Sequence, residues 1–302
     1  MKKHLNTFRQ IYIFLILIII YLPLLIVVLI SFNGSTSKGN INLIFGVPES
    51  GAGGSAYDQL LEDGSFSQAL LNSFIVALVS TPVSVIIATM TAFAIWNNKK
   101  FYNKASIAIS SISISTPEVI AGLSLMILFA ATWLSFNRSL GLFTIIVSHI
   151  SFCTPYAFVA IYPRMQKMNK NLILASDDLG YSKVATFFKV TIPYLLPAIL
   201  SGAAIAFAMS FDDFIITNLV RGSTQTVSTQ LYLMRKGVKA WAAAFGAIIV
   251  LLTIGITAIF VIHKALVERN KHREKVIKRS QKLTKLNLRS NIKKNSKTVR
   301  VD

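Results

Sequence analysis

Several residue types and motifs are scarce in this sequence of 302 residues, and each gap excludes a class of function. The only cysteine, Cys153, can form neither an intrachain disulfide nor a cysteine-based zinc site, and its apolar surroundings predict a small core residue. The four histidines share no ligand spacing. We therefore expect no metal site and no catalytic histidine.

The motifs of nucleotide-binding and hydrolytic enzymes are also missing. The sequence contains no G-x-x-x-x-G-K-[ST], no H-E-x-x-H and no G-x-S-x-G pattern. Without the first of these, the chain has no loop of that kind to hold the phosphates of ATP. We expect a non-catalytic protein with no cofactor of its own.

What the sequence has instead is apolar residues in long runs. Hydrophobic residues make up 53% of the chain and the mean hydropathy is +0.59, which favours a membrane protein over a soluble domain. Lipid offers no partner to free backbone groups, so the spans are expected to be helices. We predict an all-α, polytopic transmembrane helical bundle of about six spans, at residues 11–31, 69–96, 105–134, 142–162, 196–220 and 241–263.

The first apolar run, residues 11–30, is too long for a signal peptide. It covers about 20 residues, or about 30 Å of helix, which matches the hydrocarbon thickness of a bilayer. Signal peptides have apolar regions of about 7–15 residues and an A-x-A-like cleavage site, which is not found here. We expect this run to be retained as the first helix.

The basic residues predict the orientation of the chain in the cell membrane. With a cytoplasmic N-terminus, 25 of the 31 Lys and Arg residues fall in inside segments and 6 in outside segments. The expected arrangement, N-in and C-in, has a cytoplasmic N-terminus (1–10), a transmembrane domain (11–264) and a basic cytoplasmic tail (265–302). Within the transmembrane domain lie an outer loop (32–66) and a cytoplasmic loop (164–195).

The tail and the outer loop carry little apolar sequence. From residue 264 onward there are 14 basic and 3 acidic residues, so the tail cannot bury a core and is expected to be solvated or attracted to membrane lipid. Nucleic acid is the less favoured alternative for so basic a tail, and we expect no nucleic-acid partner. The outer loop is rich in Gly and Ser and mildly acidic, which predicts a flexible segment.

The cytoplasmic loop contains a polar stretch, LASDDLGYSKVATFFKVTIPYLLP, at residues 174–197. Ser176 is expected to cap a short helix, with Asp177 and Asp178 in its first turn. Gly180 is expected to break the chain there, and Ser182 to start a second short helix that ends near residue 189.

Apolar residues at helical spacing lie within that second helix. Val184, Phe187 and Phe188 are expected to share one face. Pro193 and Pro197 are expected to end the helix and begin the next span. The pattern alone also fits a plain amphipathic connector that lies on the lipid surface.

The spacing in this stretch resembles the EAA loop of binding-protein-dependent ABC importers, E-A-A-x3-G-x9-I-x-L-P. The matching positions are Ala175, Gly180, Val190, Ile192 and Pro193. Leu174 replaces the usual Glu and Ser176 the second Ala, which puts one polar contact in doubt but keeps the register. In that family the loop is the coupling helix that docks into a groove on the ATPase subunit. The resemblance implies an ATPase-coupling role for Ala175, Ser176, Asp177, Asp178, Gly180, Val184, Phe187, Phe188 and Pro193.

Three further stretches are similar to the second permease subunit of spermidine/putrescine importers, a branch of the MetI-like superfamily. They read ISTPEVIAGLSLMILFA, FTIIVSHISFCTPYAFVAIYPRMQ and AILSGAAIAFAMSFDDFIITNLVRG, and the resemblance covers most of residues 8–266. It implies a polyamine permease that works with a homologous second permease, a dimer of ATPase subunits that bind the ATP, and an extracytoplasmic binding protein.

Acidic residues inside the predicted spans are the candidates for a substrate path. Glu118 follows Pro117 within the third span, and Asp212 and Asp213 lie in the outer half of the fifth. A charged side chain at mid-membrane costs about 2.5–3.5 kcal/mol, so each needs a partner or a water-filled cavity. The functional interpretation is a path for a cation with several ammonium groups. The structural alternative is an Asp that pairs with Arg or caps a broken helix.

The same importer architecture for another small solute is one alternative, and two other classes of protein also remain open from the sequence. A secondary transporter driven by an ion gradient would favour inverted repeats and discontinuous helices, and no clear internal repeat is found. A membrane anchor or scaffold would act through the basic tail. Copurification with an ATPase excludes the first, and a mild effect of removing residues 271–302 excludes the second.

Overall fold

The computed structural model describes residues 2–36, 38–44, 55–96, 100–133, 136, 138–234 and 237–298. This part of the chain is helical and forms no named strand, and its isolated β-bridges include Gly34 with Ser55 and Ser35 with Ile41. The chain divides into two units, Met1–Tyr57 with Ala240–Asp302, and Asp58–Lys239. The all-α prediction is confirmed.

Five helical runs of the described residues are long and apolar enough to cross a membrane. They are α1 (Lys2–Ile30), α3 (Gly64–Trp96), α6 (Leu142–Gln166), the run Lys183–Asp212 that ends as α9 (Ile192–Asp212), and α12 (Ala240–Thr298). The predicted second, fourth and sixth spans lie within α3, α6 and α12, and α1 covers all but the last residue of the predicted first span. The predicted fifth span starts too late, because its helix already begins at Lys183.

The third predicted span is broken rather than continuous. α4 (Lys100–Ser115) and α5 (Glu118–Thr132) meet at an angle of 98°. Pro117 causes the break, because it lacks a backbone N–H and disfavours the helical conformation of Thr116 before it. The pair counts as a sixth span only if both halves are taken together.

The first unit contains α1, α12 and part of the outer loop. The Asn33 side chain donates a hydrogen bond to the Asn42 carbonyl at 2.7 Å, and the hydroxyls of Ser31 and Tyr57 lie 2.9 Å apart. The loop also contains a short helix, α2 (Ala56–Glu62), so part of the segment expected to be flexible is helical. Its Gly-rich part, residues 45–54, lies outside the described residues.

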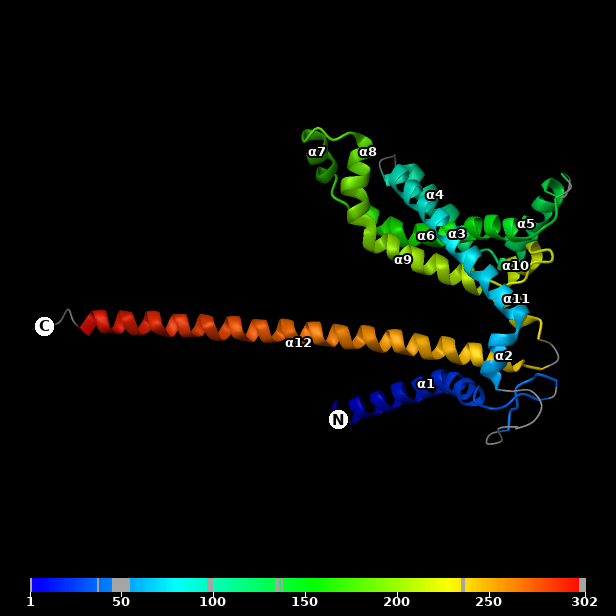
Figure 1. The fold of residues 1–302 in the computed structure, drawn as a ribbon. Coiled ribbons are helices and arrows are strands. Elements are labelled where there is room, and N and C mark those ends of the chain that lie inside the picture. The colour runs from blue at the N-terminus through cyan, green and yellow to red at the C-terminus, as the bar shows by residue number, and fades with distance from the viewer. Residues whose placement is uncertain are drawn as a thin grey trace. The chain divides into compact units, whose positions relative to one another are not determined.

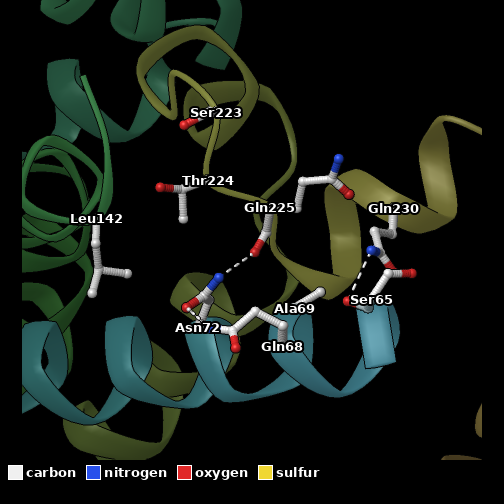
Figure 2. A pocket seen from close by; sticks show the side chains of 9 residues that line it. All are labelled: Ser65, Gln68, Ala69, Asn72, Leu142, Ser223, Thr224, Gln225 and Gln230. Carbon is white, nitrogen blue, oxygen red and sulfur yellow. Dashed lines mark hydrogen bonds between the residues drawn. The ribbon is translucent and has the colours of Figure 1, made fainter. Parts of the chain in front are cut away.

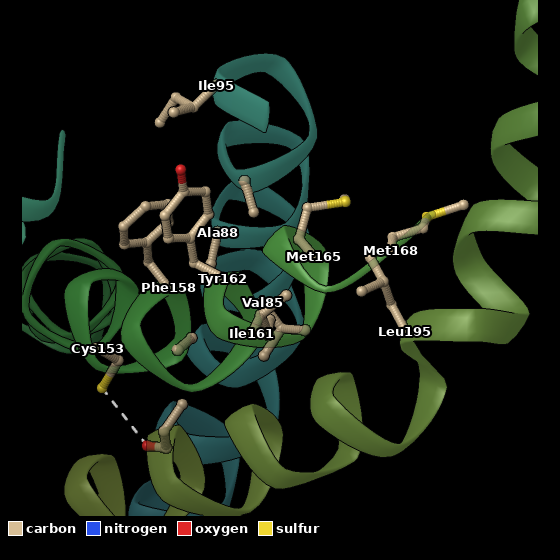
Figure 3. Close-up of a cluster of buried hydrophobic side chains, with 13 residues drawn as sticks. Val85, Ala88, Ile95, Cys153, Phe158, Ile161, Tyr162, Met165, Met168 and Leu195 are labelled. Atoms are coloured by element: carbon tan, nitrogen blue, oxygen red, sulfur yellow. Dashed lines mark hydrogen bonds between the residues drawn. The ribbon is translucent and has the colours of Figure 1, made fainter. Parts of the chain in front are cut away.

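The core of the second unit lies where α3, α6 and α9 pack together (Figure 3). Small residues let the helices approach closely. A Cβ at Gly202 would lie 3.2 Å from the Ile161 side chain and 3.3 Å from the Ala157 carbonyl oxygen. Cys153 is fully buried in this core, and its thiol donates to the Ala206 carbonyl at 3.5 Å.

The two ends of the second unit differ in structure. Figure 1 shows the short helices α7 (Asn171–Asp178) and α8 (Lys183–Thr186) at one end and α5, α10 (Ile215–Val220) and α11 (Val227–Tyr232) at the other. At the second end Val76, Phe129, Ile145 and Val220 form a separate buried apolar cluster. By the predicted orientation, α7 and α8 are cytoplasmic and α10 and α11 face outward.

Candidate functional site

The cytoplasmic loop folds as a turned protrusion, residues 171–191. Gly180, between α7 and α8, has a φ of +78°, the left-handed conformation that glycine adopts without strain. Ser182 then caps α8, because its hydroxyl oxygen accepts a hydrogen bond from the Ala185 backbone N–H at 3.2 Å. The predicted break at Gly180 and helix start at Ser182 are confirmed.

The first helix of the protrusion begins earlier than predicted. α7 starts at Asn171, so Ser176 lies inside the helix and does not cap it. Asp177 and Asp178 are consequently in its last turn instead of its first. The cap was assigned to the wrong residue because α7 carries apolar residues on the N-terminal side of the polar stretch.

The second helix does not end at the prolines. α8 continues through a π-helical turn (Phe187–Thr191) into α9, and the whole run from Lys183 to Asp212 is one helix. Pro193 lies in the first turn of α9, directly after the widened turn, where a missing N–H is tolerated. α8 and the candidate membrane span α9 are therefore parts of one continuous helical run.

The inner side of the protrusion is held by specific contacts. The hydroxyls of Ser176 and Thr186 lie 2.8 Å apart, and both residues are buried. Phe187 packs edge-on against Phe93 of α3, with ring centroids 4.9 Å apart. The first contact joins α7 to α8, and the second joins the following turn to the transmembrane core.

The outer side of the protrusion exposes apolar side chains. Leu179 is 76% exposed, Val184 68% and Phe188 63%, and Tyr181 is also exposed. Val184 and Phe188 share a face, as predicted, but Phe187 does not belong to it because it turns toward Phe93. Exposed apolar residues grouped in this way are typical of a surface that contacts another protein or a membrane.

The second candidate site lies at the end of α9, where the fifth span breaks. Asp213 has an extended backbone (φ −63°, ψ 125°), and α10 starts two residues later. Its Oδ2 accepts hydrogen bonds from the Thr217 backbone N–H and hydroxyl, both at 2.8 Å, and its Oδ1 accepts one from the Ile216 N–H at 3.3 Å. The carboxylate thus caps α10 and stabilises the break.

His149 of α6 joins this carboxylate from the side. Its Nε2 lies 2.9 Å from the Thr217 hydroxyl and 3.4 Å from Asp213 Oδ2, and its Nδ1 lies 2.8 Å from the Ser210 hydroxyl. The Ser210 hydroxyl in turn lies 3.0 Å from that of Ser80 on α3. The side chains of His149 and Asp213 are 1% and 2% exposed, so the whole arrangement is excluded from solvent.

The other two candidate carboxylates have different surroundings. Asp212, the last residue of α9, is exposed. Glu118 is half-buried in the first turn of α5, directly after the bend at Pro117. Two of the three candidate carboxylates therefore remain accessible in the second unit, and both lie beside a break in a transmembrane helix.

A polar pocket of about 410 Å³ opens between the outer ends of α3 and α6 and the segment that leads to α11 (Figure 2). Asn72 donates a hydrogen bond to the Gln225 carbonyl at 2.9 Å, and Gln230 donates one to the Ser65 carbonyl at 3.0 Å. The lining has seven amide or hydroxyl side chains, two apolar ones and no charged one: Ser65, Gln68, Ala69, Asn72, Leu142, Ser223, Thr224, Gln225 and Gln230. This chemistry suits neutral polar groups such as a peptide backbone.

Sequence reasoning passed over His149. It was set aside because the histidines share no ligand spacing, and its partners Ser210, Asp213 and Thr217 are more than 60 residues away in the chain. Its position inside a strongly apolar run was the available signal, because a buried polar side chain needs a partner. Among the described residues no group of three His, Cys, Asp or Glu side chains is arranged to hold a metal ion.

Relatives in sequence cover most of the chain. A protein of Mycoplasma pneumoniae named as a homolog of the spermidine/putrescine transport system permease protein PotC is 55% identical over 86% of this chain and 91% of its own length. The spermidine/putrescine transport system permease protein PotC of Escherichia coli K12 is 28% identical over 83% of this chain and 90% of its own length.

A solved structure shows the same fold. The crystal structure of a bacterial ABC transporter involved in the import of the acidic polysaccharide alginate contains a chain that matches with a TM-score of 0.63 at 13% identity, over 87% of this chain and 96% of its own. The family model for the binding-protein-dependent transport system inner membrane component matches residues 51–272. The chain belongs to this family of inner membrane components.

Proposed function

We propose that this chain is one of two permease subunits of an ATP-driven polyamine importer. The observation that carries the coupling role is the protrusion, which exposes Leu179, Val184 and Phe188 and is continuous with a transmembrane helix. Because α8 and α9 form one helical run, a partner that binds α8 and moves it also moves α9. The force comes from a dimer of ATPase subunits, because this chain has no phosphate-binding loop of its own.

The substrate class rests on charge as well as on relatives. The sequence relatives described above are named for spermidine and putrescine. The chain has only 12 acidic residues and a formal net charge of +19. Two of these acidic residues, Glu118 and Asp212, nevertheless lie beside helix breaks within the spans. Carboxylates at such places lower the barrier for a cation with several ammonium groups.

The outer pocket supports a contact with an extracytoplasmic binding protein. Its amide and hydroxyl lining pairs with neutral polar groups and has no carboxylate to attract a polyamine. We assign it to the docking of a polar segment of that partner and not to the substrate. The substrate then passes from the binding protein to a path between this chain and a homologous second permease.

The function is tested by uptake of labelled spermidine and putrescine in cells that contain the partner subunits, with and without this chain. The proposal expects saturable uptake that is lost on deletion and restored by the wild-type chain. If both uptakes are unchanged on deletion, the polyamine assignment is rejected. A ligand screen of the partner binding protein then identifies which other small solute the importer carries.

A further inference from the structure

Five polar side chains in the second unit form one buried chain of hydrogen bonds across four helices. It runs from Ser80 on α3 through Ser210 on α9 and His149 on α6 to Thr217 on α10 and Asp213 at the break. Each step is between 2.8 and 3.0 Å. An apolar bundle buries such groups only when each has a partner, so the chain of contacts is a specific feature of this fold.

The donors and acceptors can be assigned in order from the carboxylate. The Thr217 hydroxyl donates to Asp213 Oδ2, so its oxygen is left to accept a hydrogen bond. His149 Nε2 must then carry the proton and donate to Thr217 Oγ1. It also lies 3.4 Å from Asp213 Oδ2 and is the histidine atom that faces the buried charge. On the other side, Nδ1 pairs with the Ser210 hydroxyl.

The two neighbouring aspartates therefore have different roles. The Asp213 side chain is 2% exposed, caps α10 and faces His149, so its role is structural. Asp212 is exposed, and its side chain takes part in none of the hydrogen bonds and ion pairs described above. A substrate cation can reach Asp212, whereas it can reach Asp213 only after the break has come apart.

We infer that His149 is a positioning residue for the substrate path: it holds Asp213 in the break between α9 and α10 and so leaves Asp212 as the one cation-facing carboxylate of this pair. The inference rests on the proposed function for the role of Asp212. The coupling of His149 to Asp213 itself is independent of the substrate.

The test uses the complete importer and compares histidine variants that keep different hydrogen bonds. His149→Leu removes both the Ser210 and the Thr217 hydrogen bond. We expect labelled spermidine uptake per assembled complex to fall at least about tenfold, because the buried Asp213 carboxylate also loses the imidazole that lies 3.4 Å from its Oδ2. His149→Gln places an amide N–H near the position of Nε2 and is expected to recover most uptake. His149→Asn reaches only toward Ser210 and is expected not to.

A second substitution separates positioning from packing. Asp213→Asn removes the buried charge while its amide oxygen can still cap α10, so the double variant His149→Leu/Asp213→Asn is expected to regain uptake to within about threefold of Asp213→Asn alone. If the double variant is no better than His149→Leu, or if Asn rescues as well as Gln, His149 is only a packing residue and the inference is wrong. The inference is also wrong if Asp213→Asn alone abolishes uptake in a stable complex.

Thermal unfolding of the purified importer distinguishes this failure from a failure of the proposed function. We expect His149→Leu to lower the unfolding temperature less in the Asp213→Asn background than in the wild-type chain, whatever the substrate. If that coupling is found but Asp212→Asn leaves spermidine uptake unchanged, the buried pair is correct and the role of Asp212 in the path is wrong. If the two substitutions are additive in stability, the buried pair itself is refuted.

Discussion

The cytoplasmic protrusion and the break at the end of α9 use opposite chemistry. The protrusion exposes Leu179, Val184 and Phe188, while the break encloses Asp213 and His149 within the second unit. Each arrangement is unfavourable unless something else is present: a partner protein over the apolar residues, or hydrogen-bond partners around the buried charge. The break has its partners within the chain, whereas the proposed function assigns the cover of the protrusion to the ATPase subunit.

This difference predicts which substitutions affect assembly and which affect the path. Changes on the outer face of the protrusion should weaken binding of the ATPase without altering the transmembrane unit. Changes at the break should leave the ATPase bound and alter the passage of the substrate.

The largest effect is expected at Gly180. Proline cannot adopt a φ of +78°, so Gly180→Pro would force α7 and α8 apart, and we expect uptake to fall about a hundredfold or more. Asn tolerates the left-handed conformation, so Gly180→Asn is the matched control and should keep most of the activity. Equal loss in both variants would mean that the turn geometry is not the cause.

Phe188→Ala is expected to reduce copurification of the ATPase subunit about tenfold, because a large exposed anchor is removed from the contact surface. The matched control is Phe143→Ala, since Phe143 is 53% exposed at the opposite end of the second unit. Pull-down from detergent-solubilised membranes measures both. A similar loss with Phe143→Ala would show that the effect is not specific to the protrusion.

Asp212→Asn is expected to lower spermidine uptake about three- to tenfold while the ATPase stays bound, because one charge that attracts the cation is lost. Asp212→Glu keeps the charge and should retain most of the uptake. Initial rates in proteoliposomes, corrected for the amount of complex, give the comparison. Loss of uptake in both variants to the same extent would point to shape instead of charge.

The smallest effect concerns the buried hydroxyl pair that joins α7 to α8. Ser176→Ala leaves the Thr186 hydroxyl buried without its partner and should destabilise the complex by about 1–3 kcal/mol. Adding Thr186→Val removes the second polar group and should restore most of the stability. Thermal unfolding of the purified complex tests both variants, and a double variant less stable than Ser176→Ala would contradict this account.

The apolar runs were sufficient to predict most of the transmembrane helices, because length and hydropathy alone define such a span. The turn of the protrusion was predictable from Gly180 and Ser182, whose conformational preferences act locally. The bend also has a local signal, Pro117 itself, but the apolar run 105–134 predicts a continuous span. The helix start at Asn171 also has a local signal, because the Asn169 side chain accepts a hydrogen bond from the Asn171 backbone N–H at 3.0 Å, but it lies before the polar stretch on which the cap was predicted.

The break at Asp213 could not be predicted in the same way. Neither glycine nor proline interrupts residues 203–220, so the sequence was interpreted as one span. The break is held by His149 and Ser80, which come from α6 and α3 and are far away in the chain. Capping of a broken helix by one Asp was a possible outcome from the sequence, but the residue that faces the cap depends on tertiary packing.

The most direct test of the account is photo-crosslinking from the protrusion in the assembled importer. A photoreactive phenylalanine analogue is placed at residue 188, and another at residue 143 as the control. The account predicts a crosslink to the ATPase subunit from residue 188 only, with a yield that changes when ATP is bound. A crosslink from residue 188 to lipid alone, with the ATPase present in the complex, would contradict the claim that this protrusion couples ATP hydrolysis to transport.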